Sequence, residues 1–285
     1  MSTSRNRPMQ HIDRKSLYTS LEARIRYLHS FLDFGGNDID ALKSGAKYIQ
    51  ALIPAVVNIV YRKLLQYDIT ARAFTTRSTA FEGPLDENPD EESPQILHRK
   101  MFLRAYLKKL CSDPTQMEFW EYLDKVGMMH TGIGRTHPLH IEYIHIGAGL
   151  AVIQDVLTEA ILSHPRLHLQ RKMAIVKALG KVIWIQNDLF TKWYVHDGEE
   201  YTDGMDFGII EKEGWLHGKK VLNEEDGTSS DASDDTATGS SGTCPASGKK
   251  ASATAGVCPF TGASASMADL KLNEDKSVKQ PVASS

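Results

Sequence analysis

This sequence has few cysteines and a small net charge, and each of these features argues against a class of protein. The three cysteines among 285 residues have no regular spacing. A secreted fold held by disulfides is therefore not expected. A cytoplasmic location is expected instead. Lysine and arginine total 33 against 36 acidic residues. No nucleic-acid partner is expected, because the basic pairs Lys219-Lys220 and Lys249-Lys250 are too short to follow a duplex.

Long hydrophobic runs are also lacking. No stretch of about 18 apolar residues suggests a membrane span, and the N-terminus has no apolar signal-peptide segment, so no membrane partner is expected. The acid-free, Ser/Arg-rich start Met1–Pro8 is faintly similar to a transit peptide. It carries no amphipathic apolar face, which argues against that interpretation.

Large apolar side chains become rare toward the C-terminus. Between Asn223 and Ser266 there are only Val257 and Phe260, too few to offset the entropy of ordering the chain. We expect a flexible start over residues 1–12, one folded domain over residues 13–197, and a low-complexity, mostly disordered tail over residues 198–285. Such a tail is too polar to fold as a kinase, cyclase or methyl-accepting output domain.

The expected folded domain has a helical pattern throughout, with no convincing strand pair or hairpin turn. One apolar stripe with steps of three and four residues predicts a first helix that ends at Gly35-Gly36; it consists of Leu17, Leu21, Ile25, Leu28 and Leu32. Start signals predict further helices at Asn37, Pro54, Ser93-Pro94, Asp113-Pro114, Pro138 and Pro165, the last two reaching Ser163 and His196. The fold class is therefore all-α, with seven or eight helices.

A histidine lies on the apolar face of the helix expected over Thr115–Thr131. His130 falls within about 60° of Phe119, Leu123 and Val126. Gly127, three residues before it, is expected to leave space in front of the imidazole ring. Such a neutral imidazole suits an axial haem ligand. A core histidine whose ring bonds to a backbone carbonyl is the alternative that spacing alone favours.

Three segments together resemble protoglobins and the globin domains of globin-coupled sensors. Residues 126–134, VGMMHTGIG, are similar to the family's proximal-histidine segment, with Ile133 and Gly134 at the matching positions. Residues 59–64, IVYRKL, are similar to its distal helix, and residues 178–194 to its last globin helix. The resemblance implies a globin-like fold with an extra N-terminal helix, and haem b as the cofactor.

The resemblance also assigns roles to individual residues. His130 would be the proximal ligand of the haem iron, and Tyr61 would donate a hydrogen bond to bound dioxygen. In the alternative interpretation, Tyr61 is a tyrosine at the edge of a helix face whose hydroxyl reaches water.

Four more residues are expected at the haem, with less support. Val126 lies one turn before His130; Phe102 and Phe74 align with pocket positions, although each fits a plain core residue equally well. Tyr143 resembles a tyrosine that lies near the proximal side in the sensors. The spacer before it, beginning at Arg135, is about three residues longer than in the sensor pattern.

Other clusters suggest different chemistry. Histidines 137, 140 and 145 crowd around Glu142, but His145 falls about 140° from His140 on a helix, so a solvated helix start is favoured over a zinc site. Cys244-Pro245 and Cys258-Pro259 are similar to haem-regulatory pairs, with chance occurrence in the tail as the favoured alternative.

These observations predict a haem-binding globin that binds dioxygen, and CO or NO, in gas sensing or storage. Its partners would be these gases, a second copy bound through the last two helices, and, for sensing, an unknown signalling partner. An enzyme that uses the haem for NO dioxygenation or peroxide chemistry is the alternative, although electrons would have to come from elsewhere. A haemless helical interaction module is the third possibility, and His130 argues against it.

Overall fold

The computed structural model describes residues 9–78, 80–205 and 213–222. The chain divides into two compact units, residues 1–232 and 233–285, and every described residue lies in the first. The predicted all-α fold is confirmed, since the described residues form nine α-helices, one 3₁₀ helix and a two-stranded hairpin. In chain order these are α1 (Arg14–Thr19), α2 (Leu21–Phe31), α3 (Gly36–Leu65), α4 (Asp68–Ala71), η1 (Arg72–Thr75), α5 (Pro94–Leu110), α6 (Met117–His130), α7 (Tyr143–Ser163), α8 (Leu169–Thr191), α9 (Glu199–Thr202), β1 (Trp215–Leu216) and β2 (Lys219–Lys220).

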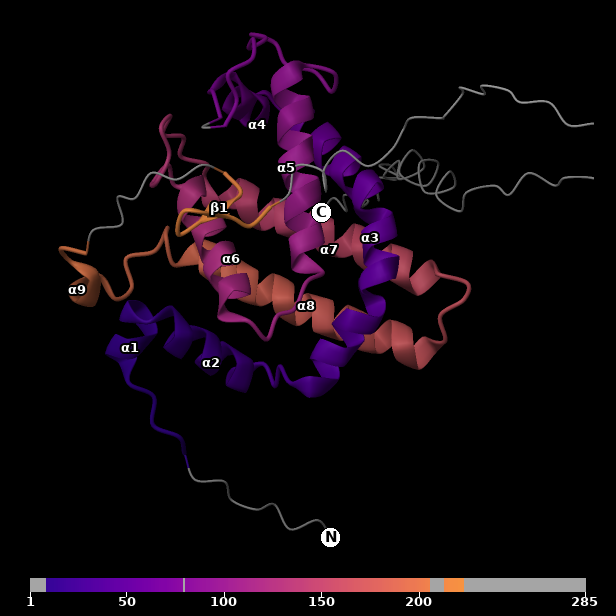
Figure 1. The fold of residues 1–285 in the computed structure, drawn as a ribbon, viewed down its shortest axis with the longest axis vertical. Helices are drawn as coiled ribbons and strands as arrows, with labels where there is room; N and C mark the ends of the chain where they lie inside the picture. The colour runs from indigo at the N-terminus through magenta and orange to yellow at the C-terminus, as the bar shows by residue number, and fades with distance from the viewer. Residues whose placement is uncertain (1–8, 79, 206–212, 223–285) are drawn as a thin grey trace, which may run out of the picture. The chain divides into compact units, whose positions relative to one another are not determined.

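Five long helices enclose the hydrophobic core. Helix α8 packs against α3, α6 and α7, while α3 also packs against α5 and α7 (Figure 1). Every one of these five helices contributes buried apolar side chains; fully buried examples are Val56, Ile96, Leu123 and Ile185, and Leu157 is 3% exposed. The helices therefore form one continuous core rather than separate layers.

The N-terminal apolar stripe forms two helices where one was predicted. Ser20 separates α1 from α2, and its hydroxyl accepts a hydrogen bond from the Ala23 amide at 3.3 Å. This is an N-cap, which a serine supplies more readily than it continues a helix. Helix α2 is held to α8 by Arg24, whose guanidinium donates to both carboxylate oxygens of Asp188 at 2.6 and 2.9 Å. The extra helix expected before the core is therefore joined to its last long helix.

Helix α3 continues through the proline at which a new helix was predicted to begin. It runs over 30 residues with Pro54 inside it, and it begins after Gly35 rather than with Asn37 as its cap. The residues on either side of the proline explain this outcome. Ile53 is 2% exposed and Val57 is fully buried, so their packing offsets the hydrogen bond that proline cannot make.

The predicted starts of α5 and α6 differ in accuracy. Helix α5 begins as expected, with Ser93 as its cap and Pro94 in the first turn. Helix α6 begins at Met117, because the Asp113 carboxylate accepts from the Thr115 amide at 3.0 Å and forms a turn before the helix. The two long helices after α6 are also shorter than expected, since α7 begins at Tyr143 and α8 ends at Thr191.

Helix α7 corrects the expectation about hydrophobic runs. By length and composition alone, this 21-residue helix could cross a membrane. Polar residues such as Asp155 interrupt its sequence, so no continuous apolar run was apparent. A single helix of this kind is weak grounds for a membrane span, because core helices of soluble proteins meet the same criterion. Only 17% of its most apolar window is buried among the described residues.

The fold extends past residue 197, where the flexible tail was expected to begin. Helix α9 and the antiparallel β1–β2 hairpin follow α8, and Leu216 and Leu222 are each 6% exposed in the hydrophobic core. The hairpin lies beyond the residues for which a purely helical pattern was predicted, in the part that was expected to be a disordered tail. The four apolar residues of this segment stand in two adjacent pairs and gave no periodic signal; they are Trp215, Leu216, Val221 and Leu222. Residues 1–8 and 223–285, with both Cys-Pro pairs, lie outside the described residues.

Candidate functional site

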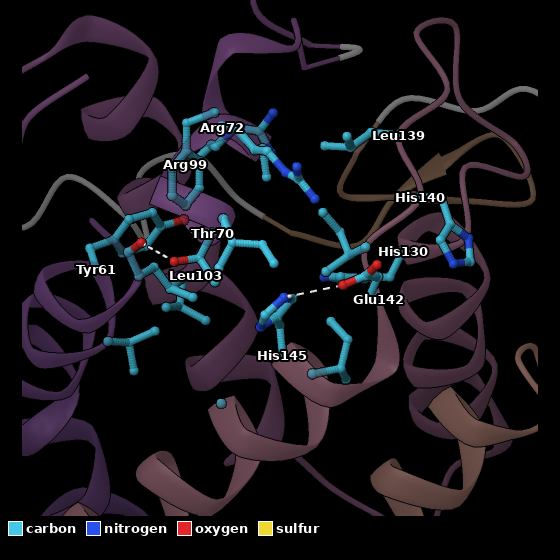
Figure 2. Close-up of a pocket in the computed structure, with 18 of the residues that line it drawn as sticks. Tyr61, Thr70, Arg72, Arg99, Leu103, His130, Leu139, His140, Glu142 and His145 are labelled. Atoms are coloured by element: carbon cyan, nitrogen blue, oxygen red, sulfur yellow. Dashed lines mark hydrogen bonds and ion pairs between the residues drawn. The ribbon is translucent and has the colours of Figure 1, made fainter. Parts of the chain in front are cut away.

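A large cavity lies between the end of α3, the α4–η1 segment, α5, the loop after α6, and α7. Its volume is about 560 Å³, within the range of sites that enclose a sizeable organic ligand. Figure 2 shows it from one side, and its lining includes Tyr61, Leu64, Phe74, Leu103, His130, Ile146, Leu150 and Ile153. We call it the main cavity. A side cavity of about 220 Å³ shares Tyr61, Arg99, Leu103, His130 and Arg135 with it.

His130 is the last residue of α6 and lines both cavities. Its ring Nδ1 donates to the Val126 carbonyl, 2.7 Å away, because a carbonyl oxygen can only accept. The ring also meets the edge of Phe190, with centroids 5.1 Å apart. Burial lowers the pKa of the imidazole below its usual value. At neutral pH the side chain is therefore uncharged, with a lone pair on Nε2 for a ligand.

Glycines near His130 shape its surroundings, though not all as predicted. Gly132 and Gly134 end the helix with φ angles of 90° and 73°, as expected. Gly127 does not clear space for the ring. A Cβ atom there would lie 2.4 Å from the carbonyl oxygen of Leu189, so this glycine lets α6 cross close to the backbone of α8.

Tyr61 reaches the cavities from α3. Its side chain is 6% exposed, and its ring lies 5.6 Å from that of Phe74. In Figure 2 it lies across the main cavity from His130. Burial raises the pKa of the phenol well above its usual value, so the hydroxyl keeps its proton. The site thus places a buried hydroxyl donor opposite a neutral imidazole.

Three arginines line the main cavity, and the sequence reasoning missed all of them. Arg72 and Arg99 lie along one edge in Figure 2, while Arg135 follows the glycines after α6. The Nε atoms of Arg99 and Arg135 are buried and have no hydrogen-bond partner among the described residues. Unpaired buried donors favour an anionic occupant, such as a carboxylate. No local pattern distinguishes these arginines from surface ones.

Three of the four other predicted residues line one of the two cavities. Phe74 lines the main cavity, and Phe102 and Val126 line the side cavity. Tyr143 lines neither one. Its hydroxyl donates to Asn187 Oδ1 at 2.7 Å, which ties the start of α7 to α8.

The histidine-rich segment that leads into α7 partly lines the main cavity, although a solvated helix start was favoured. His140, Glu142 and His145 line it, whereas His137 does not. His145 Nε2 lies 3.5 Å from a carboxylate oxygen of Glu142. Among the described residues no three His, Cys, Asp or Glu side chains are grouped to hold a metal ion. A zinc site is therefore not supported in this part of the chain.

The cavity residues fit a haem group on three independent grounds. The neutral imidazole of His130 offers one nitrogen ligand. Apolar side chains such as Leu103 and Ile146 supply walls for a flat macrocycle. The guanidinium of Arg99, whose buried Nε has no hydrogen-bond partner among the described residues, suits a carboxylate of such a macrocycle, whereas Arg135 already pairs with Glu213.

Comparison with known proteins shows to which family the chain belongs. A search among curated proteins finds no match. A scan against family models matches Protoglobin over residues 21–200. This range contains α2 to α8 and both His130 and Tyr61, and it ends before the hairpin. Globins of this family bind gases and normally carry haem. The chain belongs to the protoglobin family.

Proposed function

We propose that this protein is a haem b globin that reversibly binds dioxygen, and CO or NO at the same position, in gas sensing or storage. The observation that carries the proposal is the neutral imidazole of His130 across a large apolar cavity from the buried hydroxyl of Tyr61. When bound, haem supplies an iron atom with one coordination position for a small gas.

His130 would hold the iron through Nε2. The hydrogen bond from Nδ1 to the Val126 carbonyl fixes the tautomer and the ring orientation. The edge contact with Phe190 restricts rotation of the ring. The low pKa keeps the ring ready to bind metal at neutral pH, because a protonated imidazole has no lone pair to give.

Tyr61 would act on the opposite side. A buried phenol donates one hydrogen bond to a partly charged ligand atom, a bond worth about 1.5–3 kcal/mol. Packing against Phe74 holds the ring in place. CO accepts such a bond less readily than dioxygen, so the tyrosine favours dioxygen.

The absorption spectrum of the purified protein tests the function directly. Purified protein supplied with haem is expected to show a Soret band that shifts on reduction and again on addition of CO. A chain that stays colourless after haem is supplied would rule out the proposed function. Steady-state NO consumption with a reductant supplied separates a gas carrier, which consumes little, from an enzyme.

Replacement of Tyr61 by phenylalanine is expected to keep haem and to speed dioxygen release about tenfold to a hundredfold, because one hydrogen bond to the ligand is lost. Stopped-flow measurement of the dioxygen off-rate checks this. Tyr67→Phe is the matched control, since Tyr67 is 53% exposed. An unchanged off-rate in Tyr61→Phe would mean that another residue is the donor.

The exposed faces of α7 and α8 support a homodimer. Ile144 on α7 is 70% exposed and Trp184 on α8 is 60% exposed. The hydrogen bond from Tyr143 to Asn187 brings these ends of the two helices together. Leu169 and Met173 extend the apolar surface along α8, at 65% and 47% exposure. Exposed apolar surface of this kind is typical of a subunit interface.

Trp184→Glu is expected to convert the dimer to a monomer, because large aromatic side chains dominate interface energies and a buried carboxylate is costly. Sedimentation velocity of the haem-loaded protein measures the change. Leu97→Glu is the control, because Leu97 is 47% exposed near the start of α5, a helix that is not among the main packing partners of α7 or α8. A wild-type protein that sediments as a monomer at high concentration would contradict the dimer.

A further inference from the structure

The segment from Glu213 to Leu222 lies beyond the family match yet packs on the globin helices. The matched region ends at residue 200. Leu216 and Leu222 are both buried in the hydrophobic core, and the hairpin turn between the strands uses Gly218 with φ 74°. We call residues 213–222 the strap. Since the family match does not cover it, its role belongs to this chain rather than to the general globin fold.

The strap crosses the edge of the site between α5 and α6. Figure 1 shows β1 beside α6, and the Lys125 ammonium of α6 donates to the Trp215 carbonyl. On the α5 side, a Cβ atom at Gly214 would lie 3.5 Å from the Phe102 ring. Glu213 and Gly214 therefore form part of the wall of the side cavity, together with His130.

Glu213 makes two part-buried polar contacts from the strap. One carboxylate oxygen accepts from the Ser78 hydroxyl at 2.7 Å, and the other lies 3.2 Å from the Arg135 guanidinium. The side chains of Arg135 and Glu213 are 6% and 16% exposed. Removing one member of such a pair leaves an uncompensated buried charge.

The pair lies close to the predicted iron ligand. Arg135 follows His130 by five residues, and both side chains line both cavities. Glu213 lines the side cavity together with His130 and Arg135, so its negative charge lies in the same lining as the predicted ligand. Arg99 adds a second positive charge to the same lining. The strap therefore supplies a negative charge to a region where α5 and the loop after α6 supply positive ones.

We propose that Glu213 is a positioning residue of the haem site, an inference that rests on the proposed function. Its carboxylate holds the guanidinium of Arg135 beside His130, anchors the strap over the α5–α6 edge, and balances the positive charge there. Bound haem is then retained by a closed edge, and its reduction potential depends on the charge pair. A nearby negative charge favours the oxidised, more positive iron and lowers the potential, while a positive charge raises it.

Single and double variants of the full-length, haem-loaded protein test this proposal. Glu213→Gln is expected to raise the reduction potential and to speed haem transfer to an apoglobin acceptor about tenfold, because one charge-assisted contact at the edge is lost. Arg135→Gln is expected to shift the potential in the opposite direction. The Glu213→Gln/Arg135→Gln double variant is expected to return close to the wild-type potential.

The matched control is Glu118→Gln, which removes the same charge from an exposed position at the other end of α6. It is expected to change neither the potential nor haem loss. Shifts of the same sign in both single variants, or no shift in either, would overturn the role of Glu213 while leaving the proposed function intact. If the wild-type chain takes up no haem, both proposals are overturned. Far-ultraviolet circular dichroism identifies any variant that fails to fold. The double variant leaves no unpaired charge, so its rate of haem transfer then decides: faster transfer than in the wild-type protein supports the closed edge, and an equal rate overturns it.

Discussion

His130→Ala is expected to abolish stable haem uptake. The imidazole is the one nitrogen ligand that the described cavity residues present with a fixed tautomer, through its bond to the Val126 carbonyl. Without it, haem would be held by apolar contacts and by the arginine donors alone, which give no bond to the iron. Titration of haem into the purified variant, followed through the Soret band, measures the loss. Added imidazole is expected to restore a ligated spectrum by entering the space that the side chain vacates.

The control for this variant is His196→Ala. That side chain is 86% exposed, beyond the end of α8, so its loss should leave haem uptake unchanged. Wild-type affinity and spectrum in His130→Ala would show that a different residue binds the iron. His145, which lines the main cavity from α7, would be the next candidate to replace.

Gly127→Ala is expected to destabilise the fold by about 3 kcal/mol, because the core would have to accept one extra carbon where there is no room. The added Cβ would lie 2.4 Å from the Leu189 carbonyl oxygen and 3.2 Å from the Cα of Phe190. Both neighbours are backbone atoms of α8, which cannot rotate away as a side chain can. Urea unfolding of the haem-free protein measures the change in free energy. The separation of α6 from α8 would also disturb the contact between His130 and Phe190.

Gly180→Ala is the matched control, in α8 itself. A Cβ at that position meets no atom within 4 Å. The variant is expected to be about 0.5 kcal/mol more stable, since alanine loses less chain entropy than glycine in a helix. Equal effects of the two substitutions would mean that helix propensity rather than the crossing of α6 and α8 determines the result.

The helical nature of the chain and the position of its key histidine could be predicted from residue patterns. The stripe on α6 is confirmed by Phe119 and Leu123, which are 1% and 0% exposed. The start of α5 at Ser93-Pro94 is also correct, because cap preferences depend on local hydrogen bonds. The helix start predicted at Pro54 is wrong, because here contacts with distant segments outweigh the local preference. Proline weakens a helix locally, but the burial of Ile53 and Val57 comes from segments distant in sequence.

The candidate site was predictable in part, because a residue's place within one helix can be recognised from the sequence alone. His130 lies on a periodic apolar face, and the resemblance assigned a role to Tyr61, so both could be named in advance. Arg99, Arg135 and Glu213 could not, since each is a charged residue in an ordinary surface pattern. Their importance arises where a loop, a helix and a segment beyond residue 200 meet around one cavity.

By itself the sequence determined the helix faces, the family, and the place of His130 on the apolar face of a helix, because these depend on spacing within one helix or on order along the chain. Only the tertiary structure decided what surrounds that histidine. The close crossing at Gly127, the buried Arg135–Glu213 pair and the strap over the α5–α6 edge join residues 62 or more positions apart. Contacts over such separations depend on how the whole core packs, and no local pattern encodes them.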